Sequence, residues 1–382
     1  MKREALPFIA VLGILSSPLL ATNWEIATVD GGDVGYYSSL ALDADGRPCI
    51  AYTTSGNVAP KAVLKYASLV GSAWVSQDIQ AGRCFNPSLA LDQAAMPSVA
   101  YQKHGQLSFI RQASGGVWHN EIAATSQSAS YDTVGNHPSL AISVDGTVNI
   151  SHFQWNAGDL LYTRLDAGEW TTSPVDTVGW IGSWNSIALD EDGNPCISCH
   201  NNTDLTVRYS HYDGTSWTTQ TLPGRGYGTS LKMSSAGFPY ISYWDCWSNR
   251  LLCAHYSGSC WIVEVVADVT ASNTYTSLAL DRQGNPHVAY WDIENQQLCH
   301  AYRGTSGWIT EFIDAAYGYQ SMQIDSRGNI HISYYDRTSG DLKYAYGAIP
   351  EPTGLSALMV AVARMILWVR RTNSTRSSAA ES

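Results

Sequence analysis

Hydrophobic and polar positions recur along this chain with a period of 44 to 51 residues. Each repeat begins with a phrase of the type Ser-Leu-Ala-Leu-Asp and continues with a glycine-containing turn and a second apolar run. The phrase starts at Ser39, Ser88, Ser139, Ser186, Ser230, Ser277 and Ser321. A fixed period in this range predicts a repeat architecture, in which each repeat is one supersecondary unit.

One repeat predicts four short strands. Residues 277–281 alternate large and small side chains and predict the first strand, and Pro286 opens the second at 287–290. A third strand is expected around 298–302, and a fourth at 308–313, where a tryptophan begins the run. Four antiparallel strands in about 40 to 50 residues predict one propeller blade.

The strands that begin with tryptophan are also seven in number, but the first of them comes before the first phrase. Their leading tryptophans are Trp24, Trp74, Trp118, Trp170, Trp217, Trp261 and Trp308. Trp24 precedes the first phrase, whereas the repeat that begins at Ser321 has only three strands. Residues 24–30 are therefore expected to supply the missing strand and so remove two open sheet edges. The sequence predicts an all-β, seven-bladed β-propeller of four-stranded antiparallel blades, whose last blade is closed by the N-terminal strand.

The chain is expected to have three parts. Residues 1–21 carry two basic residues and then an apolar run, which predicts a secretory signal cut near Ala21 or Thr22. Residues 22–348 form the propeller. Residues 349–382 break the repeat with an apolar run and a basic end. We therefore expect an exported protein that is anchored to the membrane, transiently or permanently, at its C-terminus.

Composition narrows the partners. The formal net charge is −11, which makes nucleic acid a poor partner. Tryptophan (14) and tyrosine (22) far outnumber phenylalanine (6), and rings with a polar edge suit both blade interfaces and sugar-facing surfaces. Cys196 and Cys199 point to opposite faces of a strand, so packing is favoured over redox chemistry. The sequence spacing shows no group of metal ligands, and we expect neither a metal ion nor a cofactor.

The C-terminal segment contains Pro350, Glu351 and Pro352, an apolar run over 354–369, and then Arg370 and Arg371. This arrangement resembles the PEP-CTERM sorting signal. The resemblance covers about the last 30 residues and implies recognition by an exosortase-type enzyme in a Gram-negative-type bacterium, often one that makes extracellular polysaccharide.

Two features depart from that pattern: Arg364 interrupts the apolar run, and the tail after Arg371 is longer than usual. A charged side chain at a helix centre costs roughly 2.5–3.5 kcal/mol of insertion free energy. The alternative is a plain transmembrane helix, with the two terminal arginines held inside by the positive-inside rule. Both interpretations place the propeller outside the cytoplasm.

The two faces of the propeller are expected to differ. One face, the turn face, carries short and similar turns between the first and second and between the third and fourth strands, which indicates a role in folding only. The other, the loop face, carries longer and more variable connections rich in aromatic residues. Function concentrates on variable loops held by a rigid frame, so the site is expected on the loop face.

Candidate ligand-binding residues are those that break the repeat in the third and fourth blades. His152 lies where other blades have tyrosine, and the fourth blade has Cys199 at that position, followed by His200. Nearby loops add further histidine and tryptophan residues. This set is His137, His152, Trp155, Trp180, Trp184 and His200. A second set recurs in three consecutive blades, where each aspartate either contacts ligand or closes an Asx turn: Trp244, Asp245, Trp291, Asp292, Tyr335 and Asp336.

Over residues 24–347 the chain resembles bacterial propellers with sialidase-like (BNR-type) repeats. It lacks the Arg-Ile-Pro motif, the Ser-x-Asp-x-Gly-x-x-Trp box and an evident arginine triad of sialidases. A non-enzymatic surface module that binds carbohydrate is therefore favoured. A glycan-active enzyme, either a sialidase-like hydrolase or a polysaccharide lyase, and a protein-interaction scaffold remain the alternatives, because propellers host many functions.

Overall fold

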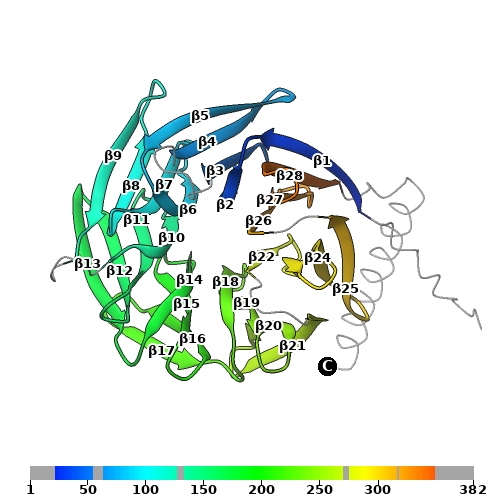
Figure 1. The fold of residues 1–382 in the computed structure, drawn as a ribbon. Coiled ribbons are helices and arrows are strands. Elements are labelled where there is room, and N and C mark those ends of the chain that lie inside the picture. The colour runs from blue at the N-terminus through cyan, green and yellow to red at the C-terminus, as the bar shows by residue number, and fades with distance from the viewer. Residues whose placement is uncertain (1–21, 55–62, 127–132, 270–274, 316–317, 349–382) are drawn as a thin grey trace, which may run out of the picture. The chain divides into compact units, whose positions relative to one another are not determined.

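The computed structural model describes residues 22–54, 63–126, 133–269, 275–315 and 318–348. In these ranges all regular secondary structure is β-strand, and seven four-stranded sheets surround a central axis (Figure 1). No helix suited to crossing a membrane occurs among them. The predicted signal peptide and the predicted sorting signal both lie outside the described residues.

Each blade runs outward from the axis. The first strands, which lie nearest the centre in Figure 1, are β2 (Val34–Leu42), β6 (Cys84–Leu91), β10 (Asn136–Ile142), β14 (Ile181–Leu189), β18 (Tyr227–Met233), β22 (Thr276–Leu280) and β26 (Gln320–Ile324). The second strands are β3 (Pro48–Thr54), β7 (Pro97–Lys103), β11 (Val148–Gln154), β15 (Pro195–Asn201), β19 (Pro239–Asp245), β23 (Pro286–Asp292) and β27 (Ile330–Asp336). The third strands are β4 (Val63–Val70), β8 (Gln106–Gln112), β12 (Asp159–Asp166), β16 (Thr206–Tyr212), β20 (Arg250–Tyr256), β24 (Gln297–Gly304) and β28 (Asp341–Ala348). The fourth, outermost strands are β5 (Ala73–Ala81), β9 (Trp118–Ala124), β13 (Glu169–Asp176), β17 (Trp217–Thr221), β21 (Trp261–Asp268), β25 (Gly307–Asp314) and β1 (Asn23–Asp30).

The predicted closure is confirmed. The last sheet has the strand order β1-β28-β27-β26, so the N-terminal strand completes the seventh blade. Asp30, at the end of β1, accepts a hydrogen bond from the Tyr52 hydroxyl at 2.6 Å and pairs with Lys65 at 3.0 Å, both in the first blade. At its other end Trp24 packs edge-on against His300 of the sixth blade, with ring centroids 5.7 Å apart. The closing strand therefore joins three blades.

The recurring tryptophans pack between blades, as their fixed position predicts. Trp118 lies edge-on to Tyr66 of the preceding blade, with ring centroids 5.3 Å apart, and Trp170 lies against Phe109 at 5.2 Å. The same contact follows for Trp217 with Tyr162, Trp261 with Tyr209, and Trp74 with Tyr344 across the closure. Each blade thus covers a ring of its neighbour.

The serine that opens each phrase links one blade to the next. Its hydroxyl accepts a hydrogen bond from the backbone N–H of the residue that directly follows the repeat serine of the next blade. The seven bonds run from Leu40 to Ser321, Leu89 to Ser39, Leu140 to Ser88, Ile187 to Ser139, Leu231 to Ser186, Leu278 to Ser230 and Met322 to Ser277, at 2.9 to 3.1 Å. All seven junctions, including the closure, carry the same bond, which explains why serine recurs.

Replacing one such serine is expected to weaken the ring. Ser186→Ala leaves the N–H of Leu231 without its partner, and an unsatisfied buried donor costs about 1–3 kcal/mol. Urea unfolding of the variant should show that loss in the free energy of unfolding. Ser72→Ala, at an exposed turn serine, is the control and should change stability by less than about 0.5 kcal/mol. Equal stability of the two variants would contradict the role of the serine.

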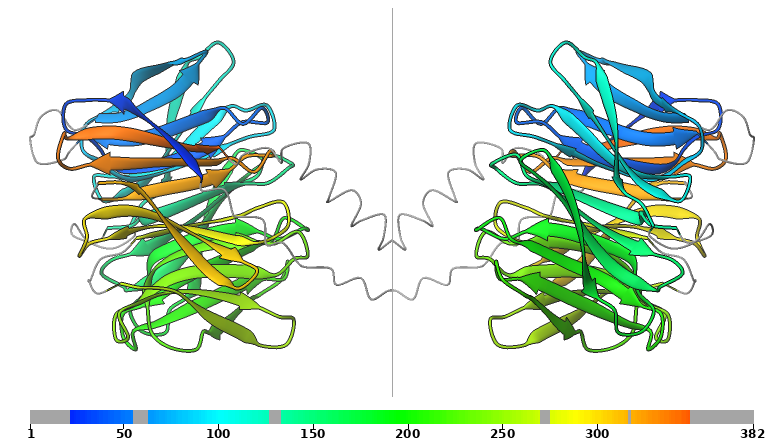
Figure 2. Two further views of the ribbon diagram at one scale, coloured as in Figure 1. Left: turned by 90° about the vertical axis from the view of Figure 1, so that its right-hand side faces the viewer. Right: turned by 90° about the vertical axis from the view of Figure 1, so that its left-hand side faces the viewer.

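Figure 2 shows the ring edge-on, with strands running between the two faces that carry the connections. All eight cysteines are free, and Cys196 and Cys199 lie fully buried on β15.

The short turns have one recurrent geometry. In the sixth blade Asp281 accepts hydrogen bonds from the backbone N–H groups of Gln283 and Asn285, both at 2.8 Å. This Asx geometry explains why the turn sequence repeats.

Candidate functional site

The mouth of the central channel on the loop face is built from one fixed position of every repeat. This position lies two residues before the repeat serine, and we call its seven residues the mouth ring. They are Tyr37, Asn86, His137, Trp184, Gly228, Tyr275 and Tyr319. Together with the residues that follow them they line a cavity of about 170 Å³. That volume equals the share of roughly five or six water molecules in the liquid.

Irregular backbone directs several ring side chains into this cavity. The first strands of the first five blades have a register shift just before the repeat serine, as between Asn136 and Ser139. At Asn86, His137 and Trp184 the backbone enters the left-handed region, with φ of 47° to 49°. A bulky residue at positive φ is rare, and such strain is concentrated at functional sites. The Trp184 carbonyl is held by a hydrogen bond from the Thr229 hydroxyl at 2.7 Å.

One side of the mouth is a network of aromatic hydrogen-bonding groups. The indole N–H of Trp184 donates to the Tyr275 hydroxyl at 3.0 Å, and the Tyr319 hydroxyl donates to the same oxygen at 2.9 Å. The Tyr319 ring contacts the rings of Tyr275 and Tyr37, with centroids 4.0 and 4.6 Å apart. Burial raises the pKa of all three tyrosines. They are therefore neutral phenols at pH 7 and poor proton acceptors.

Two polar atoms at the mouth have no hydrogen-bond partner in the protein. His137 stacks on Trp184 with ring centroids 5.5 Å apart, and burial lowers its pKa to about 4, so the imidazole is neutral at pH 7. Its Nδ1 atom is buried and unpaired, as is Oε1 of Gln320, whose amide nitrogen donates to the Tyr275 carbonyl. Gln320 is 7% exposed. Buried polar groups are normally satisfied, so these two atoms call for a partner from outside the protein, either water or a ligand.

A second aromatic surface lies between the third and fourth blades. Trp155 and Trp180 are 50% and 43% exposed and meet edge-to-face at 5.5 Å. We call them the tryptophan pair. The Trp180 backbone is fixed by bonds to Thr203 and Asn202, and the indole lies so close to Gly158 that a Cβ there would be 2.6 Å away. Glycine is therefore required at this close approach, and the pair is exposed yet held in place.

The predicted set in these two blades thus divides into three groups. His137 and Trp184 line the mouth, whereas Trp155 and Trp180 form the exposed pair. His152 is fully buried and both ring nitrogens have partners, Gly135 N–H at 3.2 Å and the Thr163 hydroxyl at 2.8 Å. 

His200 is 2% exposed and lies behind the mouth ring. Its ring contacts Trp184 at 5.8 Å and Tyr227 at 5.6 Å, and its Nδ1 pairs with the Gly226 carbonyl at 2.7 Å. These contacts support the strained tryptophan from below. A direct ligand role for His152 or His200 stays a prediction.

The second predicted set lies in the later blades. Trp244 and Trp291 are buried, and the Tyr335 hydroxyl donates to Asp33 at 3.0 Å. The three aspartates each accept a backbone N–H two or three residues further on, from Trp247 to Asp245, Asn295 to Asp292 and Thr338 to Asp336. Asp336 also pairs with Lys343 at 2.7 Å. The three aspartates therefore form the Asx turns that the sequence offered as the alternative to ligand contact. Ligand contact by this set stays a prediction.

Sequence reasoning missed two features of the loop face. The ring position was recognised only at His137 and Trp184, although its constant offset from the repeat serine and its varied residue types were a readable signal. Trp247 is 68% exposed, and the Arg225 guanidinium lies 4.5 Å from its ring centroid. That cation–π contact holds an exposed indole on the loop face of the fifth blade.

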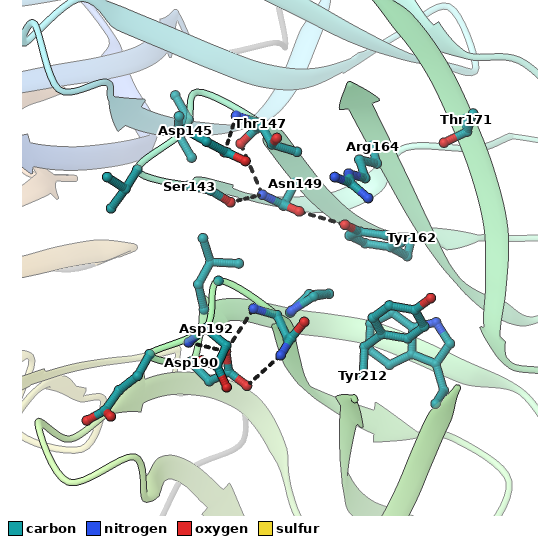
Figure 3. A pocket seen from close by; sticks show the side chains of 18 of the residues that line it. Ser143, Asp145, Thr147, Asn149, Tyr162, Arg164, Thr171, Asp190, Asp192 and Tyr212 are labelled. Carbon is teal, nitrogen blue, oxygen red and sulfur yellow. Dashed lines mark hydrogen bonds between the residues drawn. The ribbon is translucent and has the colours of Figure 1, made fainter. Parts of the chain in front are cut away.

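The turn face also carries a hollow, although the sameness of its turns indicated folding alone. A groove of about 800 Å³ lies between the third and fourth blades (Figure 3). Carboxylates of Asp145, Asp190 and Asp192 approach it from two turns, and Tyr162 and Tyr212 lie further along it. Asp190, which lines this groove, lies close to two further possible metal ligands, Cys196 and His211. The spacing of the three residues in the sequence does not indicate this group, because strand pairing brings His211 opposite Cys196.

Comparisons with known proteins define the class of fold. No protein-family model matches the chain, and no curated protein matches its sequence. A fungal alcohol oxidase solved with copper matches with a TM-score of 0.55 at 10% identity, covering 86% of this chain and 76% of its own. An ulvan lyase from a new polysaccharide lyase family matches with a TM-score of 0.54 at 10% identity, covering 84% and 94%. A Hadza microbial sialidase matches at 0.49 with 12% identity, covering 78% and 75%.

The seven four-stranded sheets make this chain a seven-bladed β-propeller, which confirms the predicted fold class, and the two structures with TM-scores of 0.54 and 0.55 share its fold. At 10 to 12% identity the likenesses concern the fold alone. Function has to be argued from the site itself.

Proposed function

We propose that this protein is an exported, non-enzymatic binding module that takes carbohydrate of an extracellular polymer on the loop face of its propeller. The observation that carries the proposal is the mouth: fixed aromatic rings beside two buried polar atoms that lack protein partners. Sugar rings offer apolar faces that stack on aromatic side chains and hydroxyls that donate hydrogen bonds. A small concave site with a few placed polar groups is the usual form of a ligand pocket.

The exposed indoles extend this surface. Trp180 lies four residues before Trp184 along the same chain segment, so the tryptophan pair is within roughly 13 Å of the mouth at 3.3 Å per residue. A glycan chain with one sugar in the mouth would lie across the pair. Exposed aromatic rings whose backbone is fixed lose little conformational entropy on binding, which favours affinity.

The lining of the mouth favours binding over cleavage. Its described residues include no Asp, Glu, Lys or Arg. A glycoside hydrolase uses two carboxylates about 5–9.5 Å apart, and a carboxylate clamp needs cations. The tyrosines, whose pKa values are raised, do not serve as bases at neutral pH.

Export and surface sorting rest on the sequence. The proposal includes removal of residues 1–21 and recognition of Pro350, Glu351, Pro352, Arg370 and Arg371 by an exosortase-type enzyme. These residues lie outside the described part of the chain. An extracellular location would bring the loop face into contact with secreted polysaccharide.

A glycan array with the 22–348 chain tests the proposal. We expect binding to one class of glycan. His137→Leu should weaken it roughly two- to tenfold, because the variant removes a hydrogen bond worth about 0.5–1.5 kcal/mol while leucine still fills the space of the imidazole. His255→Leu is the matched control, because His255 also stacks on an aromatic ring, Tyr240 at 5.2 Å, outside the mouth. Absence of binding, or equal effects of the two substitutions, would reject the mouth as the site. Shortened glycan products in the same incubations would favour an enzyme instead.

A further inference from the structure

The fourth blade gathers three different metal-binding side chains at the turn face. Asp190 follows β14, Cys196 is the second residue of β15, and His211 lies directly opposite Cys196 on β16. The carboxylate oxygen, the sulfur and a ring nitrogen all lie within 4.8 Å of one another. The His211 Nε2 atom is 2.9 Å from Oδ2 of Asp190. Backbone pairing therefore fixes the three side chains relative to one another.

The turn holds the carboxylate in place. Oδ1 of Asp190 accepts the backbone N–H groups of Asp192 at 3.0 Å and Asn194 at 2.8 Å. The side-chain amide of Asn194 reaches Oδ2 at 3.3 Å. A ligand oriented by second partners in this way is typical of metal sites.

Other blades show that this grouping is not an automatic result of the repeat. In the first blade the equivalent aspartate and cysteine are Asp43 and Cys49, but the residue opposite Cys49 is Ser68. In the sixth blade His287 faces Tyr302. Within the described ranges, only the fourth blade brings three such donors within reach. The first blade lacks the imidazole, and its Asp43 carboxylate is also taken by Arg47, whose Nε donates to Oδ2 at 2.6 Å.

The site can be reached from solvent. Asp190 lines the groove between the third and fourth blades (Figure 3) and also the groove of about 370 Å³ that His211 lines beside Trp261. The His211 side chain is 35% exposed, whereas Cys196 is fully buried. An ion would enter beside the imidazole and keep a coordination position open to water. Glu191 and Asp192 next to Asp190 add negative charge that attracts cations.

We propose that Asp190, Cys196 and His211 bind a divalent transition-metal ion of the Zn²⁺ class. Sulfur, imidazole and carboxylate together suit Zn²⁺, whereas Ca²⁺ and Mg²⁺ take oxygen ligands. Bonds of about 2.0–2.3 Å require the donors to approach by roughly one ångström, which side-chain rotation provides. Binding converts the Cys196 thiol to a thiolate, and the released proton passes to solvent. The ion lies on the turn face and is independent of the proposed glycan site.

Cobalt(II) is the probe, because it takes zinc sites and its thiolate complexes absorb in the near ultraviolet. The metal-free 22–348 chain, kept reduced, should bind one equivalent with a thiolate-to-cobalt band that Zn²⁺ abolishes. His211→Ser installs the residue of the first blade and should weaken binding at least tenfold, while Cys196→Ser should remove the band. Cys49→Ser is the matched control and should leave band and affinity unchanged.

Thermal unfolding followed by circular dichroism checks that each variant is folded. If Cys196→Ser does not fold, His211→Ser still decides, because its side chain is partly exposed. A wild-type chain without the thiolate band would overturn the proposal. So would a folded His211→Ser variant of unchanged affinity, or an equal loss of the band in Cys49→Ser.

Discussion

A chain that begins at residue 32 is expected to lose the cooperative native state that the chain beginning at residue 22 has. Without β1 the whole hydrogen-bonding edge of β28 is open. The hydrogen bond that Asp30 accepts from the Tyr52 hydroxyl and its ion pair with Lys65 are also lost. Val29 also leaves the core at the closure. The loss is comparable to the total stability of a domain, about 5–15 kcal/mol. Thermal melting by circular dichroism and size-exclusion chromatography would show it.

Two comparisons make this test specific to closure. Ile26→Ala removes an exposed side chain from the same strand and should change the free energy of unfolding by less than about 0.5 kcal/mol. A synthetic peptide of residues 22–31, added in trans, should restore part of the transition by occupying the open edge. A truncated chain that melts within a few degrees of the complete one would show that the ring does not depend on β1.

Trp155→Ala combined with Trp180→Ala is expected to weaken glycan binding by at least roughly 30-fold. Central aromatic anchors typically contribute 2 kcal/mol or more to binding. The melting temperature should change much less than the affinity, because both indoles are about half exposed. Isothermal titration with the glycan selected on the array measures the loss. This prediction depends on the proposed function.

Phe238→Ala is the control for the tryptophan pair. Phe238 is 39% exposed and lies on the turn face, so its loss removes an exposed aromatic ring from the side without the glycan site. The affinity of the Phe238→Ala variant for the glycan should equal that of the unaltered protein. Full affinity in the double tryptophan variant would confine the glycan to the mouth, and equal losses in both variants would indicate a general effect on the fold.

The sequence allowed part of the site to be predicted because the repeat assigns every residue a place in its blade. His137 and Trp184 were selected as loop residues next to the departures from the repeat in the third and fourth blades, and both line the mouth. His152 is itself such a departure, but Thr163 on the neighbouring strand satisfies its ring inside the blade. The bulges in β10 and β14 decide which of these side chains reach the mouth. The sequence of a single repeat does not show where such a bulge occurs.

By itself the sequence determined the number of blades, the strands of each blade and the closure by the Trp24 strand. These follow from the period and from the need to pair every strand edge, so repetition makes them robust to local error. Only the tertiary structure decided which side chains meet across the ring. Tyr275 bonds Trp184 across 91 residues of sequence, and Cys196 faces His211 from another strand. Such neighbours depend on register and packing around the axis, which no single repeat encodes.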